Sequence, residues 1–371
     1  MGIISILHSA FVKGKDLRKR YMSKKVLDAI WKNSLKYVEL KPLTKDQIGQ
    51  IHAYWGGYNI KYTTRWHQLL FSLTGVFRPE YEPFEICGFV QDKLSTPLKQ
   101  RYFDDKGLYR MLLSGYNIPV RVAECVGGIY FLPESHGQRE VTFEEFKKQL
   151  NNIKKCVFKP SVGTDGGRGV CLFETIDGVV TDSNATIDDF IQSLQEANIK
   201  DFCIERKIEE CDNLQCLNPT SCNSLRIHTY RNRRLGVIKY ISAYVRIGKL
   251  GKLVDNAYSG GICGQIHDDG MLHGAKSVYP YKVFTETESG VNIENYKIDN
   301  FKKMVDTVVS AHSNLTMFDL IGWDVTVDKE GNVVIIEFNP NPDVRIEQCI
   351  FDTTCLLGQQ NDIVEQALFN Y

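Results

Sequence analysis

The amino-acid sequence predicts a protein of the α+β class, in which a basic helical segment precedes a body of strands and helices. Three observations support this prediction. Residues 11–41 combine many basic residues with apolar residues at helical spacing. From about residue 85, short apolar runs alternate with amphipathic stretches. Two further apolar runs, residues 321–327 and 333–338, flank a turn and predict an antiparallel hairpin.

The composition is that of an ordinary globular protein. A chain of 371 residues can form two or three structural units around a substantial core. The 45 Lys and Arg residues balance the 45 Asp and Glu residues, so the overall charge gives no basis for binding nucleic acid. No apolar run has the length of a membrane span, and the first residues lack the pattern of a secretory leader. We therefore expect a cytoplasmic location.

The cysteines support the same location. Eleven are scattered along the chain, mostly within apolar stretches, and no CxxC pair occurs. The spacing of Cys211, Cys216 and Cys222 matches no zinc signature. Reduced, buried thiols are therefore the better interpretation.

The N-terminal region, residues 1–80, is expected to be basic and helical. Residues 11–41 contain ten Lys or Arg against three Asp or Glu. We favour a solvated helix packed on the body of the protein; the alternative is an amphipathic helix that contacts anionic lipid or an acidic partner protein. A second helix is expected to begin at Thr44, an N-cap residue.

The elements between residues 85 and 150 follow from their apolar patterns. Residues 85–95 predict a strand and a turn. Asp104 and Asp105 begin a predicted helix that leads into a strand at 119–123, and another short strand covers 127–133. Thr142, with Glu145 three residues later, forms a capping box that predicts a helix.

The second half of the chain continues the alternation. Predicted strands flank a glycine-rich loop between residues 155 and 173, and a helix is predicted over 187–195. A strand over 200–208 and two more within 223–248 follow, the last two joined by a basic turn. A final amphipathic helix, residues 300–315, precedes the hairpin.

The hairpin carries the first candidate site. Asp324 stands within an apolar strand, where an unpaired carboxylate would be expensive to bury. Glu337 and Asn339 lie on the partner strand, two residues apart and therefore on one face. Turn chemistry in the Asn-Pro-Asn-Pro-Asp segment would explain only the polar end of the strand. A bound Mg²⁺ ion, which prefers oxygen ligands, would explain all three residues.

The glycine-rich loop carries the second candidate site. Lys159 ends a strand and supplies a point charge suited to phosphate. It is followed by Ser161 and by a series of glycines whose backbone N–H groups can approach an anion closely: Gly163, Gly166, Gly167 and Gly169. The spacing matches neither a P-loop nor a dinucleotide-binding motif, and the chain returns to a strand. We therefore expect a β-hairpin that covers phosphates.

Two shorter segments accompany this loop. Lys106 begins a predicted helix, where a cation is poorly placed with respect to the helix dipole unless an anion is bound there. Glu205 ends an apolar strand, where it and the neighbouring backbone are expected to hydrogen-bond the edge of an adenine.

Two arginines complete the set of candidate residues. Arg226 and Arg246 lie within predicted strands, and buried arginines need anionic partners such as phosphate, a substrate carboxylate or an internal carboxylate. Asp255 and Asn256 begin a segment, DNAYSGG, that is expected to be a mobile loop closing over substrate. His228 is expected to point to the face opposite Arg226.

The ordered set of motifs resembles the ATP-grasp superfamily and is closest to its sugar-transfer-associated group. The resemblance covers residues 85–371 and implies the ATP-grasp fold, in which two α+β subdomains clamp ATP. The pre-ATP-grasp region is shortened. The implied domains are the N-terminal region 1–80, a pre-ATP-grasp and linker region 81–150, subdomain 1 with the glycine-rich loop 151–212, and subdomain 2 with the metal site and substrate loop 213–371.

The resemblance also implies the ligands. ATP and Mg²⁺ are the expected cofactors, with two metal ions and with Mn²⁺ able to replace Mg²⁺. The metal ligands are Asp324, Glu337 and Asn339. Lys106, Lys159 and the glycine-rich loop contact the phosphates. The segment 205–208, including Lys207 and Ile208, contacts the adenine. The acid that binds the ribose is Glu209, Glu210 or Asp212.

The implied reaction is amide formation by a carboxylate–amine ligase. ATP phosphorylates a carboxylate, and an amine captures the acyl phosphate; Arg226, Arg246, Asp255 and Asn256 are the candidate catalytic residues. The substrates are small molecules such as sugar acids or amino acids, in the biosynthesis of polysaccharide, capsule or related cell-surface precursors. The alternatives are a kinase that phosphorylates a sugar or polyol hydroxyl, and a non-catalytic nucleotide-binding module of a polysaccharide assembly complex. A hydroxyl acceptor needs a general base, for which neither His228 nor Asp255 is an outstanding candidate, whereas a carboxylate is already ionised at pH 7.

Overall fold

The structure is a computed structural model. It describes residues 28, 31–32, 35–36, 38–95, 105–135, 137–162, 169–253, 255, 260–278, 280–342, 344, 346–351 and 360–369. The chain divides into two compact units, each described separately below. The first comprises Met1–Lys93, Val278–Lys282 and Asp343–Tyr371, and the second comprises Leu94–Ser277 and Val283–Pro342.

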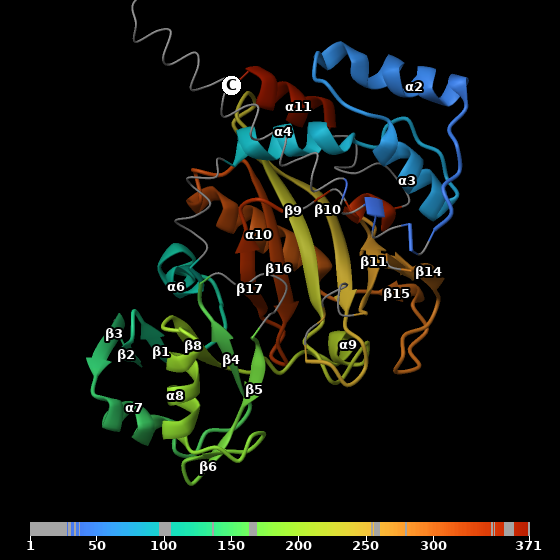
Figure 1. Cartoon of the computed structure of the whole chain (residues 1–371). Coiled ribbons are helices and arrows are strands. Elements are labelled where there is room, and N and C mark those ends of the chain that lie inside the picture. The colour runs from blue at the N-terminus through green and yellow to red at the C-terminus, as the bar shows by residue number, and fades with distance from the viewer. Residues whose placement is uncertain are drawn as a thin grey trace, which may run out of the picture. The chain divides into compact units, whose positions relative to one another are not determined.

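The first unit is helical (Figure 1). Its elements are α2 (Lys45–Trp55), η1 (Gly56–Tyr58), α3 (Arg65–Thr74), α4 (Phe84–Leu94), η4 (Ile346–Cys349) and α11 (Gln360–Phe369). The predicted N-cap at Thr44 is confirmed, because its hydroxyl accepts from the Gln47 N–H and the Gln47 side chain accepts in return. A small core joins segments from both ends of the chain: Trp66, Leu69, Leu70, Tyr81, Phe84 and Cys349.

Most of the predicted basic helix, residues 11–41, lies outside the described residues. Within the described part, Trp31 packs against the core of the first unit, and Arg65 lies over its ring. Arg65 also forms an ion pair of 2.7 Å with Asp28. Among the described residues, no helix is both long enough and apolar enough to cross a bilayer.

The strand predicted at 85–95 is wrong, since these residues form helix α4. The buried apolar residues of this segment include Ile86, Val90 and Leu94, which recur every fourth residue. That spacing is the helical one, whereas a strand would bury every second residue.

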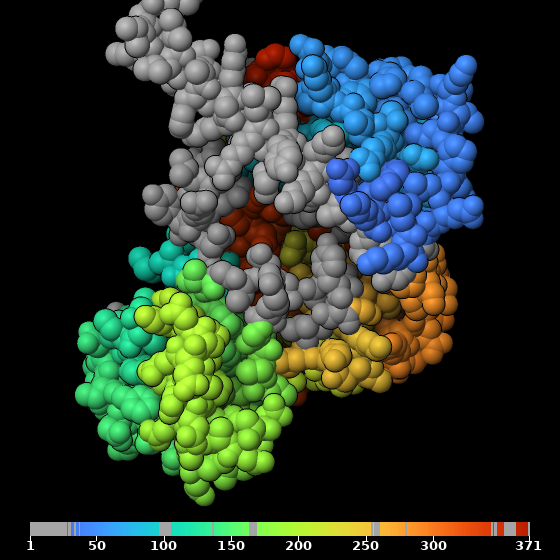
Figure 2. Space-filling view, viewed as in Figure 1, coloured from blue at the N-terminus to red at the C-terminus, as the bar shows by residue number. Residues whose placement is uncertain are grey.

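The second unit contains a smaller sheet with the strand order β3-β2-β1-β8-β4-β5. Its strands are β1 (Arg121–Val126), β2 (Ile129–Glu134), β3 (Gly137–Val141), β4 (Cys156–Pro160), β5 (Cys171–Phe173) and β8 (Phe202–Arg206). A short hairpin, β6 (Thr175–Ile176) and β7 (Val179–Val180), follows β5. Helices α7 (Phe143–Leu150) and α8 (Ile187–Glu196) contribute to its core and begin with capping boxes at Thr142 and Thr186. This part of the chain forms the green lobe of Figure 2.

Side-chain alternation divides the smaller sheet into two faces. One face packs with α7 and α8 in a core that includes Ala123, Phe158 and Ile204. The residues between them point to the other face, where Lys159 of β4 and Glu205 of β8 meet. The alternation predicted for these strands therefore separates core residues from candidate ligands.

The second unit also contains a larger sheet, with the order β14-β13-β11-β10-β9-β16-β17; β12 pairs with β11, and β15 pairs with β12. The strands are β9 (Ser224–Asn232), β10 (Val237–Ile247), β11 (Ile262–Ile266), β12 (Met271–His273), β13 (Ala275–Val278), β14 (Tyr281–Phe284), β15 (Glu294–Lys297), β16 (Leu320–Val327) and β17 (Val333–Asn339). Helix α10 (Phe301–Asn314) packs on one face, in a core that includes Ile227, Val245, Met304 and Trp323. The strands predicted within 223–248, the final helix and the hairpin are confirmed.

Short helical turns connect these sheets. The helix predicted after Asp105 is shorter than expected, consisting of η2 (Lys106–Leu108) and α6 (Tyr109–Leu112). The Asp105 carboxylate caps its start by accepting from the Gly107 N–H at 2.8 Å. Helix α9 (Asp212–Gln215) leads from β8 towards β9.

Candidate functional site

The β16–β17 hairpin brings the predicted metal ligands together. Asp324 pairs directly with Glu337, and Gly322 pairs with Asn339. Asp324 is buried, whereas Glu337 and Asn339 are half-buried. Two carboxylates and an amide therefore share one end of the hairpin, at the face opposite α10.

A β-bulge makes this arrangement possible. Asp324 pairs with Glu337 but the next residue, Val325, pairs with Ile335, so Ile336 is an extra residue on β17. In a regular strand Ile335, Glu337 and Asn339 would all point to one face. The bulge instead keeps Ile335 in the core while Glu337 and Asn339 turn to the other face.

The polar face extends across the neighbouring strands. In register, Asp324 of β16 lies opposite Arg226 of β9, which lies opposite Tyr244 of β10. The next pair of β9 and β10 on the same face is Ser224 and Arg246. Around these pairs polar residues alternate with residues of the α10 core, among them Leu225, Val245 and Trp323, so the alternation itself builds the site.

Asp324 is the centre of an ion-pair network on this face. Arg226 donates to both oxygens of Asp324, from Nε at 2.5 Å and from Nη2 at 3.2 Å. Arg246 donates to the same carboxylate from Nη1 at 3.0 Å. Burial alone would raise the pKa of Asp324, but the two arginines outweigh it and hold the pKa below its usual value. Asp324 is therefore ionised at neutral pH.

Asp255 belongs to the same network. Its Oδ1 accepts from Arg246 Nη2 at 2.5 Å, and its Oδ2 accepts from the Ser224 N–H at 3.0 Å and from the Ser224 hydroxyl at 2.5 Å. Asp255, which was expected in a mobile loop, is thus buried and anchored to β9 and β10. Asn256, the next candidate, lies outside the described residues.

His228 lies on the same face as Arg226, so the expectation that it points to the opposite face is wrong. The two residues are two positions apart on β9, and such residues share a face. A Cβ placed on Gly322 would lie 3.2 Å from Arg226 Cδ and 3.4 Å from His228 Cδ2, so both side chains flank this glycine. His228 Nδ1 also lies 3.0 Å from the Ser242 hydroxyl. Burial and, to a smaller extent, the nearby charge of Arg226 together lower the pKa of His228 to about 3.

Lys106 points towards the β16–β17 hairpin. Its Nζ lies 3.5 Å from Glu337 Oε2. Its backbone N–H donates to the Ser161 carbonyl at 3.1 Å, so it also borders the start of the glycine-rich loop. The structure therefore brings together Lys106, Ser161 and Glu337, three residues that the sequence motifs singled out separately.

The glycine-rich loop is described only at its two ends. Gly163, Gly166 and Gly167 lie outside the described residues. Gly169 has a φ of +74°, and a Cβ there would lie 2.9 Å from Pro160 Cγ. Both constraints require glycine at this position.

Lys159 and Glu205 form the centre of a second charged group, on the smaller sheet. Lys159 Nζ donates to Glu205 Oε2 at 2.8 Å, and Arg121 Nη2 donates to Glu205 Oε1 at 3.1 Å. Arg121 is paired in turn with Glu124. Sequence reasoning missed Arg121 and Glu124; the available signal was a pair of charged residues within an apolar strand. Burial alone would raise the pKa of Glu205, but Lys159 and Arg121 outweigh it and hold the pKa below its usual value.

The three acids considered for the ribose have different surroundings. Glu209 is exposed and paired with Lys155 and Lys329. Glu210 is buried and accepts from the Asn223 N–H at 2.9 Å and the Thr326 hydroxyl at 2.8 Å. Asp212 is the first residue of α9 and is exposed. Lys207 and Ile208 follow β8, and the Lys207 N–H donates to the Lys155 carbonyl at 2.6 Å.

The donor set of the hairpin fits a hard divalent cation. Asp324, Glu337 and Asn339 offer only oxygen ligands, which suits Mg²⁺. The two carboxylates already pair with Arg226, Arg246 and Lys106, so a metal ion would share them with these cations. Within the described ranges no cluster of three His, Cys, Asp or Glu residues has metal-site geometry, and the expected ligand set includes one amide, that of Asn339.

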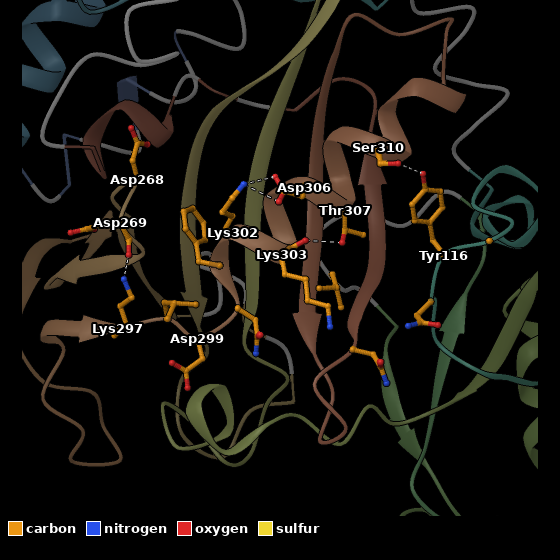
Figure 3. Close-up of a pocket in the computed structure, with 17 residues that line it drawn as sticks. Tyr116, Asp268, Asp269, Lys297, Asp299, Lys302, Lys303, Asp306, Thr307 and Ser310 are labelled. Atoms are coloured by element: carbon orange, nitrogen blue, oxygen red, sulfur yellow. Dashed lines mark hydrogen bonds and ion pairs between the residues drawn. The ribbon is translucent and has the colours of Figure 1, made fainter.

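A groove of about 930 Å³ lies elsewhere on the second unit, beside the start of α10 (Figure 3). Three of its lysines are engaged within the protein. Lys302 forms hydrogen bonds with both oxygens of Asp306, Lys303 donates to the Gly331 carbonyl at 2.6 Å, and Lys297 donates to the Asp269 carbonyl. None of the candidate site residues lines it.

Comparison with solved structures returned several ATP-dependent enzymes with low sequence identity. An N5-carboxyaminoimidazole ribonucleotide synthetase in its ADP complex is 13% identical, with a TM-score of 0.36 over 67% of this chain and 48% of that chain. The ATP-grasp ligase PsnB with its minimal precursor is 13% identical, with a TM-score of 0.39 over 74% and 63%. The biotin carboxylase domain of Hydrogenobacter thermophilus 2-oxoglutarate carboxylase is 13% identical, with a TM-score of 0.39 over 72% and 46%. The chain thus spans about half of two of these proteins and less than two thirds of PsnB.

Comparison by sequence is more decisive. No curated protein is similar enough to match. The family model described as sugar-transfer associated ATP-grasp matches residues 90–363, which is most of the chain and includes every candidate ligand discussed above. The protein therefore has the ATP-grasp fold and belongs to the sugar-transfer-associated ATP-grasp family.

Proposed function

We propose that the protein is an ATP-dependent carboxylate–amine ligase that forms an amide through an acyl phosphate. One observation carries this proposal: Arg226 and Arg246 converge on Asp324, directly beside Glu337 and Lys106. Anionic phosphates, a metal ion and an anionic acceptor can be held together by such a set. Family membership supports the use of ATP.

The nucleotide would lie between the two charged groups. Lys106 and Lys159 would contact the phosphates, and Glu205 with the segment up to Ile208 would contact the adenine. Asp212 is the best candidate for the ribose, because Glu209 and Glu210 already have partners. Asp324, Glu337 and Asn339 would hold Mg²⁺, which supplies charge neutralisation at the phosphates.

The acceptor carboxylate would bind beside Arg226 and Arg246. Its oxygen attacks the γ-phosphorus, the bond from that phosphorus to the bridging oxygen breaks, and ADP leaves. The amine nitrogen then attacks the acyl carbon of the acyl phosphate, the amine proton passes to solvent or phosphate, and inorganic phosphate leaves. Lysines and arginines that are already oriented stabilise the charge that develops during both steps.

A kinase that acts on a hydroxyl is the second candidate, and His228 is the observation that bears on it. The site face does contain a histidine, which a hydroxyl acceptor would need as a general base. However, its pKa of about 3 makes it a weak base at neutral pH. An ionised carboxylate acceptor needs no base and suits two neighbouring arginines.

The substrate class follows from the family's association with sugar transfer. We propose a sugar acid or an amino acid as the carboxylate, in the biosynthesis of polysaccharide or related cell-surface precursors. A two-subdomain division, residues 151–212 and 213–371, would place the glycine-rich loop and the metal hairpin on opposite sides of the nucleotide.

Hydroxylamine trapping tests this proposal. Purified protein would be incubated with MgATP, hydroxylamine and a panel of sugar acids and amino acids. A ligase yields a hydroxamate of one acid together with an equal amount of ADP, because hydroxylamine captures the acyl phosphate. A stable phosphorylated sugar without any hydroxamate would establish the kinase, and a protein that binds no nucleotide would overturn both.

A further inference from the structure

Glu205 has two cationic partners that come from the two strands on either side of it. β8 lies between β1 and β4 in the smaller sheet. Arg121 of β1 reaches one oxygen of Glu205 at 3.1 Å, and Lys159 of β4 reaches the other at 2.8 Å. The side chains of Arg121 and Glu205 are 4% and 9% exposed, so neither charge is well solvated.

Arg121 is fixed independently of Lys159. It pairs in register with Glu205 across the β1–β8 ladder, and its guanidinium also forms an ion pair with Glu124. Glu124 lies 3.9 Å from Arg110, which adds further positive charge at this end of the group. The Nε of Arg121 is buried and has no hydrogen-bond partner among the described residues, so this guanidinium still has an unused donor.

Lys159 has the opposite character, because its ammonium group ends a flexible stem. Burial alone would lower the pKa of Lys159, but Glu205 and, more weakly, Glu337 of the metal hairpin outweigh it and raise the pKa. In the proposed function Lys159 contacts the phosphates of the nucleotide. To do so it must leave Glu205, and a buried carboxylate that loses its cation is strongly destabilised.

We propose that Arg121 is a positioning residue for nucleotide binding, which keeps Glu205 ionised and partnered when Lys159 moves from Glu205 to the phosphates. This inference rests on the proposed function, because it takes Lys159 as a phosphate ligand. Without Arg121, Lys159 would be the sole close cation of Glu205 among the described residues, and the nucleotide would have to compete with Glu205 for it.

A double-mutant cycle on MgADP binding tests this proposal. The four proteins are the wild type, R121Q, E205Q and R121Q/E205Q, and Kd is measured by calorimetry. We expect R121Q to raise Kd by at least about tenfold when Glu205 is present, and by less than about threefold in the E205Q background. E205Q removes the carboxylate that retains Lys159, so the loss of Arg121 should then affect nucleotide binding less. A purely structural role of Arg121 would instead raise Kd by the same factor in both backgrounds.

R139Q is the matched control. Arg139 lies in β3 of the same sheet and is also paired with two glutamates, Glu134 and Glu145, but it is exposed. We expect its Kd for MgADP to equal that of the wild type. If R121Q instead raised Kd by the same factor in both backgrounds, or not at all, the inference would be overturned while the proposed function would stand.

Two further results are informative. If R121Q does not fold, R121K retains a cation with one point of contact, and we expect a rise in Kd of roughly threefold that disappears in the E205Q background. An equal rise in both backgrounds would overturn the inference. A wild-type protein that binds no MgADP would overturn the proposed function, and the inference with it.

Discussion

Asp324 and Glu337 face each other across the β16–β17 ladder, and Ile336, the residue that precedes Glu337, forms a β-bulge. The bulge reverses the faces of β17 at that point, so that a strand whose first part belongs to the core ends in the proposed metal ligands Glu337 and Asn339. The relationship between these two carboxylates is therefore a local property of the hairpin, which a substitution can test without disturbing the core.

Glu337→Gln should abolish turnover without unfolding the protein. The substitution keeps the shape of the side chain but removes one of two adjacent negative charges, so the affinity for Mg²⁺ and the bridging of the phosphates should fall. We expect ATP-dependent ADP release to fall by roughly 100-fold. The Tm should change little, because the 3.5 Å contact with Lys106 is a partly exposed pair.

Glu330→Gln serves as the control for this substitution. Glu330 lies in the exposed turn of the same hairpin and faces none of the candidate ligands. Binding of Mn²⁺, followed by electron paramagnetic resonance, should weaken in E337Q and stay unchanged in E330Q. Undiminished Mn²⁺ binding in a folded E337Q protein would refute the metal assignment.

The sequence predicted most of the second unit because its residues are locally consistent. The apolar patterns of β9, β10 and β16 predicted the strands, whereas the meeting of Arg226, Arg246 and Asp324 on one face is seen only in the structure. Capping residues such as Thr142 located the helices, since an N-cap side chain satisfies free N–H groups wherever the rest of the chain lies.

What could not be predicted depended on contacts between distant segments. The Arg121–Glu205 pair joins residues 84 positions apart, and nothing in either strand alone indicates it. Helix α4 was missed because its apolar residues are dense enough to fit a strand over a short window. The position of His228 was knowable, and the correct use of strand alternation would have placed it beside Arg226.

His228→Asn should leave turnover nearly unchanged. The Asn side chain can keep a hydrogen bond to the Ser242 hydroxyl, which now lies 3.0 Å from Nδ1, while any ring base is removed. We expect kcat to stay within about threefold of the wild type, with the same pH profile between about pH 6 and pH 8. A loss of about 100-fold, with a changed profile, would favour a general base and hence the kinase.

Gly169→Ala should weaken nucleotide binding more than an equivalent change elsewhere. Alanine at a φ of +74° is strained by about 1 kcal/mol, and its Cβ would approach Pro160 Cγ to 2.9 Å. Pro160 directly follows Lys159, so the displacement should reach the phosphate ligand. We expect the Kd for MgADP to rise by roughly fivefold or more.

Gly236→Ala isolates the effect of the clash. Gly236 has a φ of +66° in the turn between β9 and β10, and a Cβ there would have nothing within 4 Å. It should therefore lose similar stability from backbone strain, measured as ΔG of unfolding in urea, but no nucleotide affinity. Equal Kd values for the two variants would show that Gly169 has no special role in the loop.

The last prediction concerns the buried carboxyl of Glu210. Burial and, to a smaller extent, nearby Asp255 raise its pKa from 4.5 to about 7, against the opposing effect of hydrogen bonds from Asn223 and Thr326. Between these two values the folded protein retains a proton that the unfolded chain has lost, so the free energy of unfolding decreases as pH rises through this window. The decrease should approach roughly 3 kcal/mol and level off above about pH 7.

Glu210→Gln cannot titrate, so the difference between wild type and variant, measured by urea unfolding from about pH 4.5 to pH 8, should follow this curve. Glu209→Gln, which changes the exposed neighbour, should give a flat difference above about pH 5. A flat difference for E210Q as well would show that Glu210 is ionised throughout and that its hydrogen bonds outweigh the cost of burial.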